Sequence, residues 1–215
     1  MPERAANSDW RALHGLLFVA IAAAVAFVPA LHVWPLLWLV PLAAYFGLVA
    51  VVKPLRATFR PLRFGRVSTS TIAATIAITI ASCLVLVAFD VLADPDTSGL
   101  AARLPINALG GVIAAGVLFS LFNAVLEELV FRGILFDAIE SQWGGWVSVA
   151  ATAVIFGYGH MRGYPPGSVG ALLAAVYGFA LGGLRLFTGG LGLPVAAHVA
   201  ADATIFAIVA RHGVL

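Results

Sequence analysis

Two adjacent carboxylates and an arginine stand inside an otherwise apolar stretch of this sequence: Glu127, Glu128 and Arg132. Ionisable side chains at membrane depth cost several kcal/mol each, so the default interpretation of such a group is a functional site. On a helix, Glu128 and Arg132 lie four residues apart on one face and can pair. Glu127 points about 100° away from Glu128. One carboxylate is therefore neutralised locally, whereas the other is left for a group from another part of the chain.

The composition of the chain indicates a polytopic membrane protein. Of its 215 residues, 62% are hydrophobic and 10% are charged, and the mean hydropathy is +1.03. A soluble domain carries roughly 25% charged residues. The formal net charge of +2 is too small to indicate nucleic-acid binding. A single cysteine, Cys83, excludes a disulfide within the chain.

Seven apolar segments approach or exceed the length of about 20 residues that spans a bilayer. The sequence therefore predicts an all-α fold, a polytopic transmembrane helical bundle of about seven spans. The fourth segment is too long for one straight crossing, so we expect it to bend at Gly133 or to end along the interface. In the sixth segment, Gly178 and Gly182 form a GxxxG pair, which is typical of close helix packing. The segments cover approximately residues 13–31, 36–52, 67–89, 108–139, 147–160, 168–187 and 195–209.

The distribution of charge predicts the topology. Residues 53–66 carry five basic side chains and no acid, so the positive-inside rule places this loop in the cytoplasm. The N-terminus, two spans earlier, is then cytoplasmic as well, in agreement with Arg4 and Arg11. Other side chains are expected at the membrane interface, namely Trp34, Trp38 and Tyr45 as an aromatic belt and Arg185 as an anchor.

The same pattern predicts a division into two regions. Residues 1–107 form an N-terminal region of three spans with the basic loop 53–66, and residues 108–215 form a catalytic core of four spans. Because the chain is short and has almost nothing outside the membrane, we expect an integral protein of a prokaryotic inner membrane.

Helix geometry tests whether the polar groups of the core can meet. Glu127 lies about 20 Å of helix from the turn near Glu140, and His160 lies about 24 Å up the returning helix, so the two fall at similar depth. His198 is only about 6 Å from the turn that precedes it, which is shallower. A re-entrant passage of the Gly-rich turn 188–194 would place His198 deeper.

These residue types predict hydrolysis. A carboxylate and an imidazole that face each other in a dry cavity form a general-base pair, which takes a proton from the water that attacks a carbonyl carbon. A second histidine with a polar neighbour stabilises the oxyanion, and His198 shares a helix face with Asp202. Two alternatives stay open. Two histidines and two carboxylates can hold a divalent metal that activates water, and intramembrane charges also mark the ion paths of transporters.

Three motifs on successive apolar segments resemble those of the CPBP family, the CAAX proteases and bacteriocin-processing (Abi) enzymes that include the Rce1-type prenyl endopeptidases. The motifs are Glu127-Glu128-x-x-x-Arg132, Phe156-x-x-x-His160 and His198-x-x-x-Asp202. The resemblance covers about residues 108–210. It implies that Glu127 and His160 activate water, that His198 and Asp202 form the oxyanion hole, and that Glu128 and Arg132 are supporting residues.

One position departs from the Rce1-type pattern, which ends the third motif in Asn. An ionised Asp202 can only accept hydrogen bonds. Either Asp202 is protonated in its apolar setting, or it orients His198 and leaves that ring as the donor.

We therefore expect a glutamic-type intramembrane endopeptidase, with its cavity open to the cytoplasmic leaflet. Its expected partners are the lipid bilayer and a membrane-associated peptide or protein, and neither a cofactor nor a metal is expected. A prenylated tail, a bacteriocin leader and a C-terminal sorting helix are all compatible substrates. The alternatives are a metal-dependent membrane protease and a scaffold or immunity factor that binds a partner without cutting it.

Overall fold

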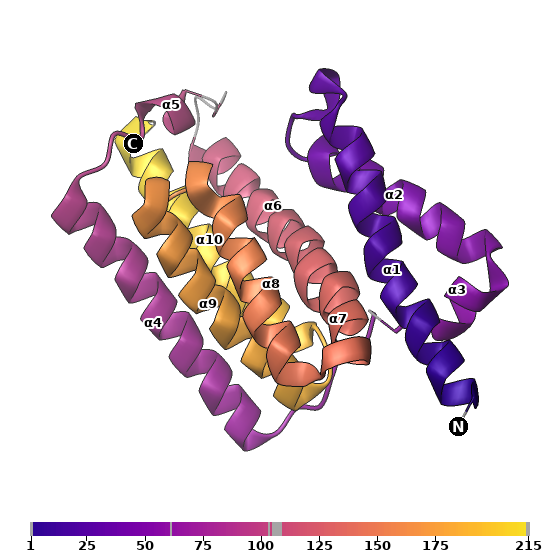
Figure 1. Cartoon of the computed structure of the whole chain (residues 1–215). Helices are drawn as coiled ribbons and strands as arrows, with labels where there is room; N and C mark the ends of the chain where they lie inside the picture. The colour runs from indigo at the N-terminus through magenta and orange to yellow at the C-terminus, as the bar shows by residue number, and fades with distance from the viewer. Residues whose placement is uncertain (1, 61, 103, 105–108, 214–215) are drawn as a thin grey trace.

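The chain folds almost entirely into helices in the computed structural model (Figure 1), which describes residues 2–60, 62–102, 104 and 109–213. No β-strand occurs within these residues. The helices are α1 (Pro2–Ala26), η1 (Pro29–Leu31), α2 (Leu36–Val51), α3 (Lys53–Thr58), α4 (Thr69–Ala93), α5 (Ser98–Ala101), α6 (Leu109–Glu128), η2 (Leu129–Leu135), α7 (Phe136–Trp143), α8 (Gly145–Gly159), η3 (His160–Arg162), α9 (Gly167–Thr188) and α10 (Gly192–Gly213).

The predicted all-α, polytopic class is confirmed. Within the described residues, five stretches are long and apolar enough to cross a bilayer, namely 9–26, 69–93, 110–143, 167–188 and 192–212. The two other predicted spans correspond to α2 and α8, which are apolar but have 16 and 15 residues. A total of seven crossings stays a prediction.

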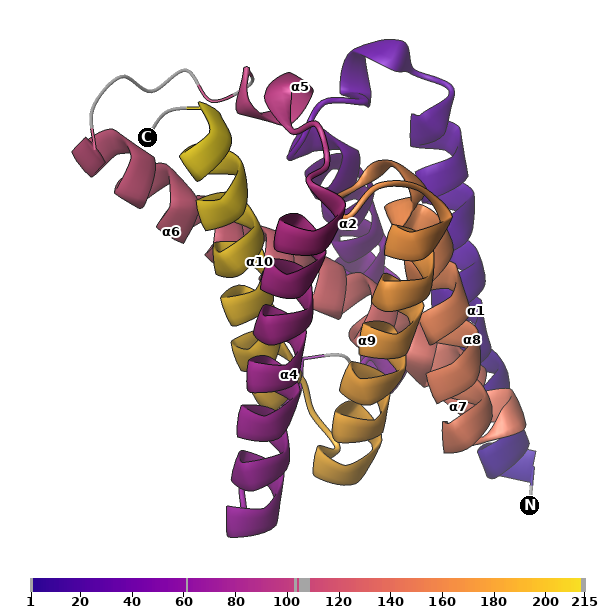
Figure 2. The same cartoon turned by 90° about the vertical axis from the view of Figure 1, so that its left-hand side faces the viewer.

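The helices form two groups (Figures 1 and 2). Helices α4, α6, α8, α9 and α10 pack together, and α4 lies against α9 and α10. The hairpin of α1 and α2 lies on the other side of α6 and packs through α1 against α7. The predicted division after residue 107 falls outside the described residues. It would separate α4 from the helices against which α4 packs.

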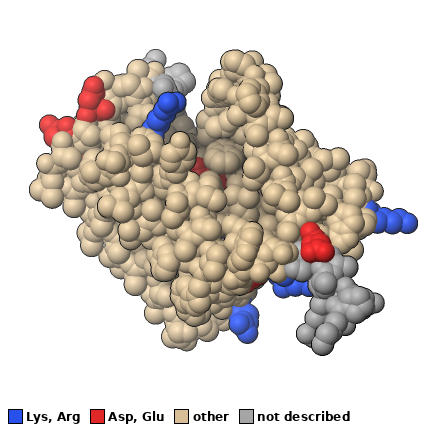
Figure 3. All heavy atoms as spheres, viewed as in Figure 1, with Lys and Arg blue, Asp and Glu red and all other residues tan. Residues whose placement is uncertain are grey.

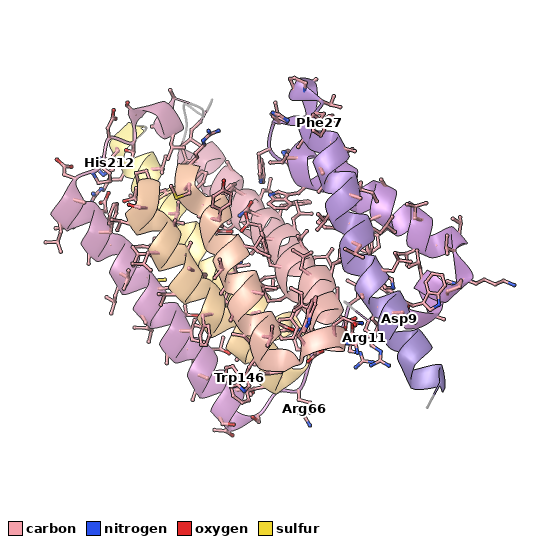
Figure 4. The ribbon with its side chains drawn as sticks, in the orientation of Figure 1. Asp9, Arg11, Phe27, Arg66, Trp146 and His212 are labelled. Atoms are coloured by element: carbon pink, nitrogen blue, oxygen red, sulfur yellow. The ribbon has the colours of Figure 1, made fainter. Side chains whose placement is uncertain are left out.

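An ion cluster joins the two groups at the end that holds the N-terminus. Arg11 extends from α1 toward α7 (Figure 4). Its Nη2 donates to Asp137 Oδ1 at 2.6 Å and to Glu140 Oε2 at 3.3 Å. Asp137 is buried, so its carboxylate depends on this arginine for charge balance.

The long fourth segment changes its helical form at the carboxylate pair. Helix α6 runs obliquely across the molecule, whereas α4, α9 and α10 are closer to upright (Figure 2). Residues 129–135 continue it as a π-helical stretch that contains Gly133, and α7 follows. Such wide turns are frequent at functional sites. The main-chain carbonyl of Arg132 in this stretch accepts a hydrogen bond from Arg185 Nε at 3.0 Å. Arg185 is buried, so its predicted role as an interfacial anchor is wrong.

The end of the basic loop pairs with the turn between α9 and α10. The N–H groups of Leu191 and Gly192 donate to the carbonyls of Arg63 and Phe64 at 2.7 and 2.9 Å. A Cβ on Gly190 would lie 2.1 Å from the main-chain nitrogen of Gly65, so this close approach requires glycine. The turn that precedes His198 is therefore covered by residues 63–66.

A second polar cluster closes the opposite end of the bundle. Asp90 near the end of α4 is buried. Tyr164 Oη donates to Asp90 Oδ1 at 2.9 Å, and Arg211 and His212 of α10 contact the same carboxylate. Figure 4 shows His212 beside the end of α4. This cluster fixes the loop after His160 to α4 and α10.

Candidate active site

The structure brings together the four predicted catalytic side chains. Glu127 comes from α6, His160 from the end of α8, and His198 and Asp202 from α10. Glu127 Oε2 lies 3.8 Å from His160 Nε2 and 3.7 Å from His198 Nε2. His198 Nε2 lies 3.7 Å from Asp202 Oδ1. The helix lengths predict that His198 lies at a different depth from Glu127 and His160, yet the side chains meet. Helix α6 runs obliquely (Figure 2), and residues 63–66 cover the turn before α10.

Glu128 and Arg132 form the predicted ion pair, and both side chains are fully buried. Arg132 Nη1 donates to Glu128 Oε1 at 2.8 Å, and Nη2 donates to the carbonyl of Gly178 at 3.2 Å. The guanidinium also lies 4.4 Å from the ring centroid of Phe156. Gly178 and Gly182 face α8 closely, as the GxxxG pair predicts. The two buried charges are thus paired, as such charges need to be, although Glu128 Oε2 and Arg132 Nε have no hydrogen-bond partner among the described residues.

Glu128 has a second partner that the helix spacing does not predict. Its Oε1 lies 2.8 Å from His198 Nδ1. Because Oε1 also accepts from Arg132 Nη1, it is the acceptor of the second contact, and His198 Nδ1 carries the hydrogen. His198 Nε2 then points toward Glu127 and Asp202. With Nδ1–H directed at Glu128, Nε2 carries a hydrogen only when the ring is an imidazolium, whose charge the carboxyl groups of Glu127, Glu128 and Asp202 would balance.

The His160 ring is oriented by its own helix. Its Nδ1 lies 2.7 Å from the main-chain carbonyl of Phe156, and its ring centroid lies 4.2 Å from that of the Phe156 ring. A carbonyl can only accept, so Nδ1 carries a hydrogen. In the neutral ring, the lone pair is therefore on Nε2, which faces Glu127.

Asp202 accepts a hydrogen bond that links the site to the N-terminal hairpin. Asn123, one turn before Glu127, donates from Nδ2 to Asp202 Oδ2 at 3.2 Å, and Trp34 Nε1 donates to Asn123 Oδ1 at 3.1 Å. Trp34 thus points toward the site, and Tyr45 is completely buried with its hydroxyl 2.6 Å from His14 Nδ1. The predicted position in an aromatic belt is therefore wrong for Tyr45, whereas Trp34 is 43% exposed and its place in the belt stays a prediction.

A cavity of about 250 Å³ adjoins the site between α4, α9 and α10. Its wall is mainly apolar, and His160, His198 and Asp202 of the site are among the residues that line it. Tyr164 and Pro165 also line it, at the end of α9 away from residues 63–66. That the cavity opens to the cytoplasmic leaflet stays a prediction. On the face shown in Figure 3, an acidic side chain is visible at the bottom of a hollow beside the hairpin.

A metal ion needs several donor side chains that converge on one point. In the parts of the chain that the structure describes, no group of three or more His, Cys, Asp or Glu side chains is arranged to hold a metal ion. The histidine nitrogens face Glu127 Oε2 at 3.7–3.8 Å. This distance exceeds that of a direct hydrogen bond.

Comparison with known proteins identifies the class of the C-terminal region. Residues 109–204 match the family model described as Type II CAAX prenyl endopeptidase Rce1-like. This match confirms the resemblance that the three motifs carry. Neither the search of curated proteins nor the search of solved structures found a match.

Proposed function

We propose that this protein is an intramembrane endopeptidase that hydrolyses a peptide bond through a water molecule activated by Glu127 and His160. The observation that carries the proposal is the position of Glu127 Oε2. This atom is buried without a hydrogen-bond partner among the described residues, and it faces the Nε2 atoms of two histidines. A buried carboxylate oxygen without a partner is costly, and a catalytic role explains why that cost is tolerated here.

The geometry supports a defined sequence of steps. A water between Glu127 Oε2 and His160 Nε2 donates one hydrogen bond to each acceptor and directs a lone pair at the scissile carbonyl carbon. As the C–O bond forms, one proton passes to this pair. The Nε2–H of His198, as an imidazolium whose Nδ1–H is held by Glu128, donates to the developing oxyanion. The proton then passes to the leaving nitrogen and the C–N bond breaks, which gives a carboxylic acid and an amine; transfer of the remaining proton between them yields the carboxylate and the ammonium group.

The supporting residues hold His198 in this role. Glu128 accepts from its Nδ1, and Asp202 Oδ1 faces its Nε2. Of the two roles that the sequence leaves open for Asp202, this arrangement favours orienting His198 over donating to the oxyanion. His198 is then the donor.

The apolar cavity supports a membrane-associated substrate with an apolar group near the scissile bond. A prenylated C-terminal peptide is the first candidate, because the matched family is described as a CAAX prenyl endopeptidase family. A leader peptide and a C-terminal sorting helix are the other two.

The experiment compares cleavage of a farnesylated CAAX peptide, a leader peptide and a sorting helix by purified protein in detergent. Wild type is compared with Glu127→Gln, Glu127→Ala and the control Asp94→Asn, each with and without a strong chelator. Asp94 lies outside the site with φ 40°, a conformation that Asn tolerates. We expect cleavage of one substrate by wild type and the control only, whether or not the chelator is present. Loss of cleavage with the chelator would support a metal-dependent mechanism, and active Glu127 variants would refute the assignment.

The topology is a second part of the proposal. We infer that residues 53–66 and the N-terminus face the cytoplasm of a prokaryotic cell, because the loop is basic. In a Cys83→Ser background, a membrane-impermeant maleimide added to spheroplasts should label Asp96→Cys and not Arg60→Cys. The reverse labelling would invert the orientation.

A further inference from the structure

We propose that Trp34 and Asn123 are positioning residues of the active site: the Trp34 indole fixes the Asn123 amide, which in turn holds the Asp202 carboxylate toward His198. The proposal rests on the proposed function, and it assigns a part in the reaction to a hairpin that lies outside the matched residues 109–204. It starts from the two hydrogen bonds that join these side chains in series.

The first step is the orientation of the amide. An indole N–H can only donate a hydrogen bond. Trp34 Nε1 lies 3.1 Å from Asn123, so the atom that faces it must be the amide oxygen. The amide nitrogen is thereby turned toward Asp202, at 3.2 Å from Oδ2. A flipped amide would set donor against donor at Trp34 and acceptor against acceptor at Asp202. Trp34 thus selects one of two orientations.

The second step is the effect on Asp202. Asn123 is buried, and so is Asp202. With Oδ2 occupied by the amide, Oδ1 is the oxygen that faces His198 Nε2 at 3.7 Å. His198 is then held at Nδ1 by the hydrogen bond to Glu128, and its Nε2 faces the Asp202 carboxylate.

The third step is how the hairpin holds Trp34. The Trp34 ring packs against Phe119 of α6 with 5.2 Å between centroids, and Phe119 packs against Phe206 of α10 at 6.1 Å. The indole therefore lies over the junction of the two helices that carry Glu127 and His198. The main chain of Trp34 belongs to the turn between α1 and α2. A displacement of the hairpin would therefore move the donor that orients the Asn123 amide.

The test removes the N–H donor of Trp34 and keeps an aromatic ring at that position. Trp34→Phe should lower kcat about tenfold, and Asn123→Ala about a hundredfold, with KM within about twofold of wild type, because a displaced catalytic group lowers the rate without removing substrate contacts. Trp38→Phe is the matched control. It is a tryptophan of the same hairpin that packs on Phe131, and it should leave kcat unchanged.

A side-chain exchange separates positioning from simple packing. Asn123→Asp places two carboxylates together and should abolish cleavage. In the double variant N123D/D202N the carboxylate at 123 accepts from Trp34 and from the amide at 202, so at least a tenth of wild-type kcat should return. Thermal unfolding of each variant serves as the check on folding.

The outcomes also separate this proposal from the proposed function. If wild type cleaves, Glu127→Gln does not, and folded Trp34→Phe and Asn123→Ala match Trp38→Phe, the positioning role is refuted and the mechanism stands. The positioning role is likewise refuted, and the mechanism stands, if N123D/D202N is no more active than Asn123→Asp. If Glu127→Gln cleaves normally, the proposed function itself fails.

Discussion

Replacement of Arg132 by methionine tests how the buried pair supports the site. The substitution keeps the length of the side chain and removes its hydrogen bonds to Glu128 Oε1 and to the carbonyl of Gly178. Breaking a buried ion pair typically costs about 3–5 kcal/mol, because the remaining charge is left uncompensated. Glu128 retains His198 as a partner, so we expect the lower end of this range, about 3 kcal/mol.

For a chain of this size, about 3 kcal/mol corresponds to a decrease in Tm of roughly 6–12 °C. The assay is thermal unfolding of the purified protein in one detergent, alongside cleavage measured well below Tm. The double variant E128Q/R132M removes both charges and should recover most of the lost Tm. It should not recover activity, because His198 loses the carboxylate that orients its ring.

Two results would refute this reasoning. An Arg132→Met protein as stable as wild type would mean that the pair adds nothing to the folded state. A double variant that is less stable than Arg132→Met would mean that the cost does not arise from an unpaired Glu128.

Three further predictions follow from other parts of the fold. Burial, and to a lesser extent the hydrogen bond to Asp90, raise the pKa of Tyr164. The contribution of the Tyr164 hydroxyl to stability should therefore be complete below the ordinary tyrosine pKa of about 10 and be lost only above it. Tyr164→Phe should remove the resulting decrease in Tm at alkaline pH. Gly190→Ala should lower both Tm and kcat, because its Cβ would meet Gly65, and a normal Tm would show that the turn tolerates a side chain. Ala174→Phe should fill part of the apolar cavity and lower kcat/KM at least tenfold for a prenylated peptide in the cleavage assay, and unchanged kinetics would place the substrate elsewhere.

The local part of the site could be predicted from the sequence. The spacing of Glu128 and Arg132 predicts their pairing on one helix face, and the structure contains that pair. Helix lengths predict that Glu127 and His160 lie at similar depth, and the two side chains meet. Both inferences need only the rise and rotation of a helix. The all-α class follows from hydropathy in the same way.

Other contacts depend on how the helices cross, which no local pattern reveals. The bond between Glu128 and His198 joins residues 70 positions apart, and the oblique course of α6 removes the expected depth difference. Arg185 is buried against the π-helical stretch, although an arginine near the end of an apolar segment is typical of an anchor.

Trp34 shows the same limit at the active site. A tryptophan beside a span predicts an interfacial belt, and its link to Asn123 spans 89 positions. The only local signal at Asn123 is its place one turn before Glu127. That spacing points to Glu127, whereas the amide nitrogen donates to Asp202.

The central claim is that Glu127 activates water and does not attack the substrate itself. A single turnover with enzyme in excess in H₂¹⁸O, followed by mass spectrometry of the new product carboxylate and of the peptide that contains Glu127, tests it most directly. Activated water predicts one ¹⁸O atom in the product and none in Glu127. Label in Glu127 with an unlabelled product carboxylate would show a covalent anhydride intermediate and would contradict the account.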